Sequence, residues 1–375
     1  MTSVRTVLVV GGGTAGCALA ALLGRAGVAV EIVERKSDFT TYGSGITLQG
    51  AALRVLRQVG VWDDLRRYGY EFNSLGMRSA DGRLLVELPD ARTGGPDLPA
   101  TLGAYRPKLA ELLAEAAVGA GAKVRLGETV EVIDQDADGV NVTFSSGDTG
   151  RYDLLVGADG IRSRTRAQLG IDVQPQPLGM GIWRVHARRP DDVVRTDLIY
   201  DGPCYIAGYC PTGPDILYAY LVEDARDRAP DTDEEKVAAM RELAASYHGP
   251  WDAIREDITE ADRINYALFE QLLIEGPWNR GRAIVIGDAA HACPPTIALG
   301  AAMALEDAAV LAEILLAHDE LSQDVFDEFV QRRMPRATVV VESSVQLATW
   351  LLEHKRDADV PGLMGRVMSL VSQPA

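Results

Sequence analysis

The chain has 375 residues, enough for one large domain or two to three ordinary ones. Its formal net charge of −17 excludes nucleic acid and anionic membranes as expected partners, because their phosphates would be repelled. None of the four cysteines forms a Cys-x-x-Cys pair or a zinc-type spacing with histidine, so we expect no metal site and a reducing compartment. No apolar run reaches 18 residues, so we expect a cytoplasmic protein without a membrane span.

The first predicted unit is a βαβ motif. Val7–Val10 reads as a buried strand, Gly11 to Gly16 fits G-x-G-x-x-G, and the helix that follows ends at Gly27. Val28–Val33 reads as the second strand and closes with Glu34, 18 residues past Gly16. In such a motif the first glycine makes a tight turn, the second admits a pyrophosphate, and the third allows close packing of helix and strand.

The carboxylate at the end of this unit predicts contact with a ribose. Glu34 can accept a hydrogen bond from a ribose hydroxyl, and it would repel a 2′-phosphate, which disfavours NADP as the bound nucleotide. Arg35 stands next to it and weakens that argument. At this point the motif indicates a dinucleotide and leaves FAD and NAD open.

Further along the chain, strands and helices alternate. Asp81-Gly82 predicts a hairpin turn within Gly76–Leu88, and Thr93–Ala100 reads as a loop. Arg106–Ala120 has helical periodicity. Three strands are predicted next, at Lys123–Leu126, Val130–Asp134 and Val140–Phe144.

The pattern becomes β-rich between Gly179 and Val222, and helical patterns return from Leu305. We therefore expect an α/β protein in which a Rossmann-like domain is interrupted by a β-rich insertion and followed by a helical C-terminus.

Tyrosines are frequent in the β-rich stretch. Tyr205 and Tyr209 share one predicted strand face and Tyr218 and Tyr220 another, whereas Trp183 and His186 point to opposite faces. Tyrosines also commonly fill half-buried strands, so simple packing is the alternative.

Two more strands end in a carboxylate. Tyr152–Arg166 contains an apolar strand followed by Asp159 and Gly160, and Gly281–Leu315 contains one followed by Gly287-Asp288. Ligands of open α/β sheets bind beyond this strand edge. The alternative for both carboxylates is capping of a following helix.

With these motifs in order, the chain resembles the single-component flavoprotein aromatic hydroxylases, the group similar to para-hydroxybenzoate hydroxylase and salicylate hydroxylase. The resemblance covers the first βαβ unit, "GSGITL" (residues 43–48), "YRPKL" (residues 105–109), the Asp-Gly motif and the Gly-Asp motif, and thus nearly the whole chain. It implies an FAD-binding domain formed by residues 1–72, 101–176 and 271–318. It also implies a β-sheet substrate domain formed by residues 73–100 and 177–270, and a helical region at residues 319–375.

The resemblance also implies roles for individual residues. FAD would be held by the pyrophosphate-binding turn, the two strand-end motifs, the ribose carboxylate and the last loop, that is by Gly11, Gly13, Thr14, Ala15, Gly16, Glu34, Arg35, Arg106, Asp159, Gly160, Asp288, Pro295, Gly300 and Ala301. Asp288 would bond the ribityl chain, and Asp159 would also serve the nicotinamide nucleotide. Many relatives carry glutamine where this chain has Leu299, so a polar contact of that side chain is absent.

Gly300 begins a predicted helix, whose free N–H groups and positive dipole end would face the pyrimidine edge of the flavin.

The implied reaction uses NAD(P)H as a transient co-substrate and O₂ to hydroxylate a small phenolic or hydroxypyridine-like substrate by way of a flavin C4a-hydroperoxide. Epoxidation, Baeyer–Villiger insertion, N-oxidation and a non-catalytic flavin sensor are the alternatives. No catalytic acid or base is assigned. The substrate-site candidates are Tyr205, Tyr209, Tyr218, Tyr220 and His186. A monomer or homodimer is expected.

Overall fold

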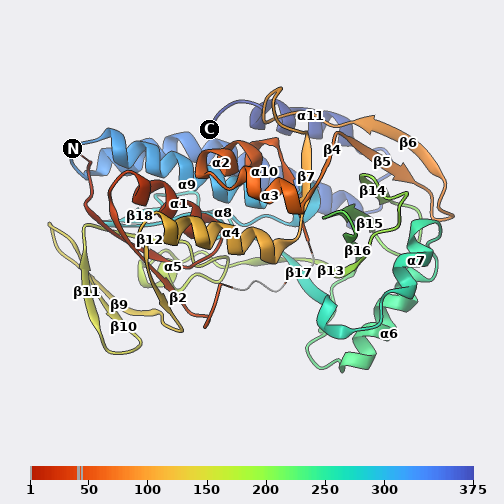
Figure 1. Ribbon diagram of the computed structural model, residues 1–375, viewed down its shortest axis with the longest axis horizontal. Helices are drawn as coiled ribbons and strands as arrows, with labels where there is room; N and C mark the ends of the chain where they lie inside the picture. Colours follow the sequence, from red (N-terminus) through yellow and green to blue (C-terminus); the bar gives the residue numbers. More distant parts are fainter. Residues whose placement is uncertain (1, 40–42, 44) are drawn as a thin grey trace.

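A computed structural model describes residues 2–39, 43 and 45–375. Two large sheets dominate it, one beneath a layer of long helices and the other at the opposite end of the molecule (Figure 1). The predicted α/β class with a helical C-terminus is confirmed. No helix formed by the described residues is long and apolar enough to cross a membrane.

The first sheet has six strands in the order β18-β19-β12-β1-β2-β8. Its strands are β1 (Thr6–Val10), β2 (Ala29–Glu34), β8 (Lys123–Leu126), β12 (Leu154–Gly157), β18 (Asn279–Arg280) and β19 (Ala283–Val285). All neighbours pair in parallel except β18 and β19. The carboxyl ends of β1, β2, β12 and β19 therefore meet at one edge, which brings four distant segments of the chain together.

Helices cover this sheet. They are α1 (Thr14–Arg25), α2 (Gly50–Val59), α3 (Trp62–Tyr68), α4 (Arg106–Gly119), α5 (Arg164–Gln168), α8 (Asp288–His291) and α9 (Gly300–Ala317). α1 packs against both α4 and α9. α9 is rich in alanine and leucine, and it is buried on nearly all sides because further helices cover its outer face.

Two small sheets flank the first one. β9 (Val130–Gln135), β10 (Val140–Phe144) and β11 (Thr149–Tyr152) form an antiparallel meander. β3 (Ile46–Gln49), β7 (Thr101–Ala104) and β4 (Tyr70–Phe72) form the other, with β7 in the middle. The β7 strand leads directly into α4 and so fixes the position of Arg106.

The second large sheet has seven strands in the order β17-β13-β16-β15-β14-β5-β6. Its strands are β5 (Ser74–Arg78), β6 (Leu84–Pro89), β13 (Gln176–Arg188), β14 (Thr196–Ile199), β15 (Ile206–Pro211), β16 (Ile216–Asp224) and β17 (Ile264–Gln271). The pairing is antiparallel except between β14 and β5. The early hairpin β5–β6, with its turn at the predicted Asp81-Gly82, thus joins strands that lie more than 100 residues later.

One face of this second sheet is covered by α6 (Asp233–Ala244) and α7 (Pro250–Glu256), which are followed by a short 3-10 turn, η1 (Ala261–Arg263). Trp183, Ala207 and Tyr209 pack there with Tyr247 and Trp251 in a closed core. The opposite face looks toward the first sheet.

Three C-terminal elements complete the fold: η2 (Pro295–Ile297), α10 (Gln323–Leu352) and α11 (Val360–Val371). α10 lies along α9 and contacts η2 and α11. The hydroxyl of Thr296 donates to the Ser344 carbonyl at 2.8 Å, which ties the proline-rich loop to α10.

Candidate active site

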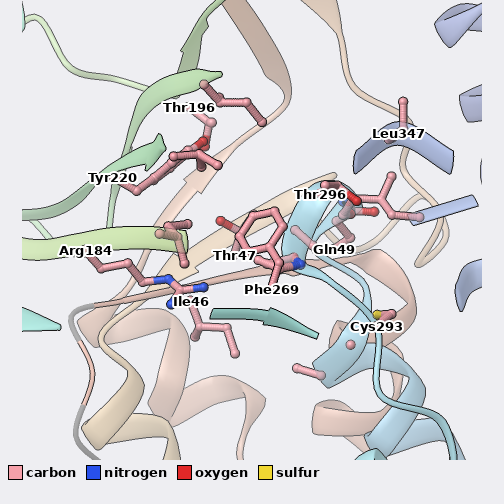
Figure 2. Close-up of a pocket in the computed structure, with 18 of the residues that line it drawn as sticks. Ile46, Thr47, Gln49, Arg184, Thr196, Tyr220, Phe269, Cys293, Thr296 and Leu347 are labelled. Atoms are coloured by element: carbon pink, nitrogen blue, oxygen red, sulfur yellow. Dashed lines mark hydrogen bonds between the residues drawn. The ribbon is translucent and has the colours of Figure 1, made fainter. Parts of the chain in front are cut away.

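A cavity of about 2200 Å³ lies between the two large sheets. It is larger than the 300–1,000 Å³ or so of a typical single-ligand pocket, and so has room for a large cofactor and a second molecule. The strand-end loops of the first sheet form one wall, and the open face of the second sheet forms the other. In Figure 2, Gln49 and Thr296 lie between Leu347 of α10 and the side chains of the β-rich wall.

The opening glycine turn leaves space where a pyrophosphate is expected. A β-carbon added at Gly16 would lie 2.0 Å from the Gly11 carbonyl oxygen, so that glycine permits close packing of α1 on the turn. Gly11 has a φ of +108°, a left-handed conformation that favours glycine. A β-carbon at Gly13 would meet nothing within 4 Å, and Gly13 lines the cavity with Thr14 and Ala15.

The amino end of α1 also points to an anion. Its cap residue is Gly13, which supplies no side-chain hydrogen bond, and the first turn contains no acidic residue. The N–H groups of such a helix end attract negative charge. The residues of this turn therefore fit the pyrophosphate of a dinucleotide.

Glu34 ends β2 with both carboxylate oxygens anchored. One oxygen accepts from the Gly12 N–H at 2.8 Å and the other from the Lys36 N–H at 2.9 Å. Glu34 and Arg35 both line the cavity. The two backbone contacts hold the carboxylate beside the glycine turn, where it can still accept a bond from a ribose hydroxyl.

Asp159 supports the start of a helix and also lines the cavity. Its carboxylate accepts from the Thr165 N–H and hydroxyl, both at 3.0 Å, and from the Ser163 hydroxyl. The cap residue of this helix, α5, is Ser163, so Asp159 bonds to the first turn without being the cap itself. Gly160 beside it has a φ of +80° and leaves open space on the cavity side.

Asp288 is different, because its side chain is open to the cavity and no described residue bonds to its carboxylate. Protein surrounds this carboxylate at the base of the cavity, and the burial raises its pKa above the ordinary value. A free acceptor in this position fits a ligand rich in hydroxyl groups, such as the ribityl chain.

The turn before Asp288 is held by a buried ion network. Asp307 of α9 accepts from the Gly287 N–H at 2.8 Å and from Arg333 Nε at 2.7 Å, and its other contact is His291 Nε2 at 2.6 Å. Burial opposes ionisation of Asp307, but His291 and Arg333 hold its pKa at about 2. His291 thus helps to hold Asp307, which in turn holds the turn before Asp288.

Two further helix ends face the cavity. Gly300 and Ala301 begin α9, which has neither a side-chain cap nor an acidic residue in its first turn. Arg106 begins α4 with its side chain exposed to the cavity, and Pro295 lines the cavity from η2. Leu299 is buried and directs no polar group into the space.

The second wall is built from side chains. Tyr218 and Tyr220 on β16, Arg184 on β13 and Phe269 on β17 all line the cavity. The Tyr218 hydroxyl lies 2.9 Å from the Thr47 hydroxyl on β3, which bridges the two halves of the molecule.

The other candidate residues of this wall need correction. Tyr209 faces away from the cavity, because α6 and α7 cover its side of the sheet, and its hydroxyl donates to Asp197 at 2.9 Å. Tyr205 does line the cavity, and only the face it was predicted to share with Tyr209 is wrong, because Tyr205 precedes β15. Its hydroxyl donates to Asp224 at 2.6 Å.

His186 stacks on Tyr105, with ring centres 4.8 Å apart, and does not line the cavity. Trp183 lies on the opposite, covered face, as the alternation of the strand predicts. Neither ring therefore reaches the cavity.

Comparison with known proteins shows to which family the chain belongs. The sequence model of a family described as "FAD binding domain" matches residues 5–344. This chain belongs to that family. The 6-hydroxynicotinate 3-monooxygenase of Bordetella bronchiseptica is 30% identical over 82% of this chain and 82% of its own length. The 2-heptyl-3-hydroxy-4(1H)-quinolone synthase of Pseudomonas aeruginosa is 33% identical over 82% of this chain and 80% of its own length.

A solved structure has the same fold. Klebsiella pneumoniae HpxO, crystallised with FAD and uric acid, superposes with a TM-score of 0.81 at 18% identity, covering 98% of this chain and 92% of HpxO. The expected family and its cofactor are confirmed: this chain is an FAD-dependent monooxygenase, and FAD is its cofactor.

Sequence reasoning missed several cavity residues. Thr47 lies within the "GSGITL" motif, part of which lies outside the described residues, and Gln49 follows it. Phe269 and Leu347 come from segments without a motif. Arg184 was not among the substrate-site candidates predicted from the sequence. Neighbouring residues of a strand point to opposite faces, and the large Trp183 side chain belongs in a core. Arg184 therefore had to lie on the other face, and this signal could have placed it at the cavity.

Proposed function

We propose that this enzyme hydroxylates a small aromatic or heteroaromatic ring that carries a hydroxyl or similar polar group, with NAD(P)H and O₂ as co-substrates. The single observation that carries the proposal is the division of one cavity between a backbone-lined wall and a side-chain wall. The names of its relatives agree, because one is a 6-hydroxynicotinate monooxygenase and another a synthase of a hydroxylated quinolone, and HpxO was crystallised with uric acid.

The first wall would hold the cofactor. Gly13 and the amino end of α1 would take the pyrophosphate, Glu34 the adenosine ribose, and Asp288 the ribityl chain. Gly300 and Ala301 would present N–H groups to the flavin ring. When bound and reduced, the flavin supplies the activation of O₂.

The second wall would orient the substrate. Burial raises the pKa of Tyr218 and of Tyr220, so both hydroxyls remain protonated at neutral pH and can donate hydrogen bonds. Phe269 is almost fully buried within this wall and would give a bound ring an apolar neighbour. The two sheets together would keep bulk water away from the reacting atoms.

Three further points belong to the same proposal. The seven-stranded sheet would be the substrate domain, with the boundaries given by the sequence. NAD(P)H would dock transiently, since no second glycine fingerprint follows a strand. The four cysteines are free thiols in the structure, which supports residence in the reducing cytoplasm.

The test begins with the purified protein. We expect it to be yellow and to release FAD, not FMN, on heating. Hydroxylated benzenes, pyridines and quinolines should then stimulate NAD(P)H oxidation, and a product should contain oxygen from isotope-labelled O₂. If FAD is bound but no ring substrate is oxygenated across such a panel, the non-catalytic sensor replaces this proposal.

A further inference from the structure

The loop that leads into α9 has a constrained backbone. It comprises residues 292–299, with the short turn η2 near its centre. Ala298 has a φ of +55°, a left-handed conformation that residues other than glycine rarely adopt, and His354 is the one other such case among the described residues. This φ is linked to the orientation of the peptide between Ile297 and Ala298. A contact with the Ile297 carbonyl therefore controls how the chain enters α9.

Gln49 makes that contact from a distant part of the chain. Its side-chain Nε2 donates to the Ile297 carbonyl oxygen at 3.0 Å. Gln49 occupies the cap position of α2, yet its side chain supplies no capping hydrogen bond to that helix. In Figure 2, Gln49 lies between Thr47 and the loop residue Thr296. The Gln49 amide thus holds the loop rather than the start of its own helix.

The strand that carries Gln49 is itself anchored. In the β3–β7 ladder Gln49 pairs with Thr101, and Thr47 pairs with Gly103. Thr47 lies two residues before Gln49 and so on the same face of β3. Its hydroxyl lies 2.9 Å from the hydroxyl of Tyr218 on the second wall of the cavity. Gln49 therefore reaches the loop from a strand that is fixed both to its own sheet and to that wall.

The amide of Gln49 is only half satisfied. Its Oε1 is buried and has no hydrogen-bond partner among the described residues. An unpaired buried acceptor costs free energy, so the stability of the protein does not by itself explain an amide at this position. What the side chain contributes is the donor on Nε2, and this donor contacts the loop that ends at Gly300 and Ala301 of the cavity.

We infer that Gln49 is a positioning residue, which holds the peptide between Ile297 and Ala298 so that the N–H groups at the amino end of α9 face the flavin. The inference rests on the proposed placement of the flavin beside Gly300 and Ala301. Reduced flavin carries negative charge at its pyrimidine edge, and the amino end of a helix attracts negative charge. Loss of the Gln49 contact should therefore weaken the binding of reduced FAD more than the binding of oxidised FAD.

The test uses Gln49→Met, which keeps nearly the same side-chain length and removes the donor. Oxidised FAD should bind about threefold more weakly and reduced FAD about 10- to 30-fold more weakly, as measured by titration of the apoprotein. The additional loss for the reduced form corresponds to a reduction potential that is lower by about 15–30 mV, since a tenfold change is about 30 mV for two electrons. In the apoprotein, the amides of residues 296–303 should exchange hydrogen faster in Gln49→Met than in the wild type.

The matched control is Gln168→Met, because Gln168 Nε2 also donates to a backbone carbonyl, that of Val130 at 3.1 Å, and lies outside the cavity. This variant should keep the wild-type potential, FAD affinity and exchange rates in residues 296–303. Equal losses for the two redox states in Gln49→Met, or unchanged exchange in these residues, would assign Gln49 to packing and overturn the inference. So would an equal change of potential in Gln168→Met.

The two assumptions beneath this inference fail in different ways. If FAD does not slow hydrogen exchange of residues 296–303 in the wild type, the flavin placement is wrong and the inference falls with it. If FAD protects these residues but no product contains oxygen from labelled O₂, the proposed function is wrong, and the effect of Gln49→Met on the potential should still be found.

Discussion

The two walls of the cavity differ in the groups that they offer to a ligand. The wall formed by the six-stranded sheet offers glycine turns and helix amino ends, together with side chains such as Glu34, Arg106, Asp159 and Asp288. The wall formed by the seven-stranded sheet uses side chains such as Arg184, Tyr218 and Phe269. A backbone site suits a cofactor that never changes, whereas a side-chain site can be altered residue by residue without disturbing the fold.

The largest expected effect concerns the network behind the backbone wall. Asp307→Ala removes the buried carboxylate that Arg333 and His291 share and leaves Arg333 with Glu306 as its remaining counterion, so the free energy of unfolding should fall by about 3–5 kcal/mol. Glu313→Ala on the same helix is the control. The Glu313 side chain is 62% exposed in its ion pair with Arg332, so this change should cost at most about 1 kcal/mol. Denaturant unfolding at pH 7 measures both, and equal losses would contradict a special role for Asp307.

Asp307 should also affect acid stability. Its folded pKa of about 2 lies below the value of about 3.9 for an unfolded aspartate, so its contribution is complete above that value and is lost as the pH falls toward 2. Asp307→Asn should therefore show a smaller loss of stability between about pH 4 and pH 2 than the wild type. Parallel stability profiles for the two proteins would show that Asp307 does not titrate in this range.

Substitutions of the two strand-end carboxylates should affect FAD binding and the stability of the apoprotein to different extents. Asp288→Ala removes a free acceptor and should weaken FAD binding by about 1.5–3 kcal/mol, with little effect on unfolding of the apoprotein. Asp159→Ala removes the bonds to Ser163 and Thr165 and should cost about 1 kcal/mol of stability, with a smaller effect on FAD. Fluorescence titration with FAD and apoprotein unfolding test the contrast. Unchanged FAD affinity in Asp288→Ala would show that Asp288 does not bind the cofactor.

Two glycines of the opening turn should likewise differ, one affecting the stability of the apoprotein and the other FAD binding. In Gly16→Ala the new β-carbon meets the Gly11 carbonyl, so the apoprotein should lose about 1–3 kcal/mol of stability. In Gly13→Ala the new β-carbon enters the cavity, so stability should stay within about 0.5 kcal/mol of wild type while FAD binds more weakly. Unfolding and FAD titration are again the measurements. Normal FAD affinity in Gly13→Ala would place the pyrophosphate elsewhere.

The smallest expected effect tests the side-chain wall. Tyr218→Phe should lower substrate-stimulated NAD(P)H oxidation about tenfold, or roughly 1.4 kcal/mol, and retain FAD. Tyr209→Phe should keep the rate, since its hydroxyl bonds Asp197 on the covered face, and should cost about 1 kcal/mol of stability. If Tyr209→Phe lowered the rate of NAD(P)H oxidation and Tyr218→Phe did not, the substrate would have to lie on the other face of the seven-stranded sheet.

The sequence by itself determined the backbone wall to a large extent. The glycine turn, α1 and Glu34 lie within 30 residues, and their contacts depend on local conformation, such as the positive φ of Gly11. The Asp159 and Asp288 motifs could be placed because the carboxyl ends of parallel strands meet at one edge. The helix bounds also agree closely, with Arg106–Gly119 found where Arg106–Ala120 was predicted.

Only the tertiary structure decided the side-chain wall. Alternation along a strand tells which residues share a face, and it correctly separated Trp183 from His186. It cannot tell which face meets the cavity, because that depends on α6 and α7 packing over the side that carries Tyr209. The exposure of Arg184 to the cavity is a long-range property of the same kind. It requires β13 to lie opposite Arg106 and the strand-end loops of the first sheet, an arrangement that no pattern within β13 specifies.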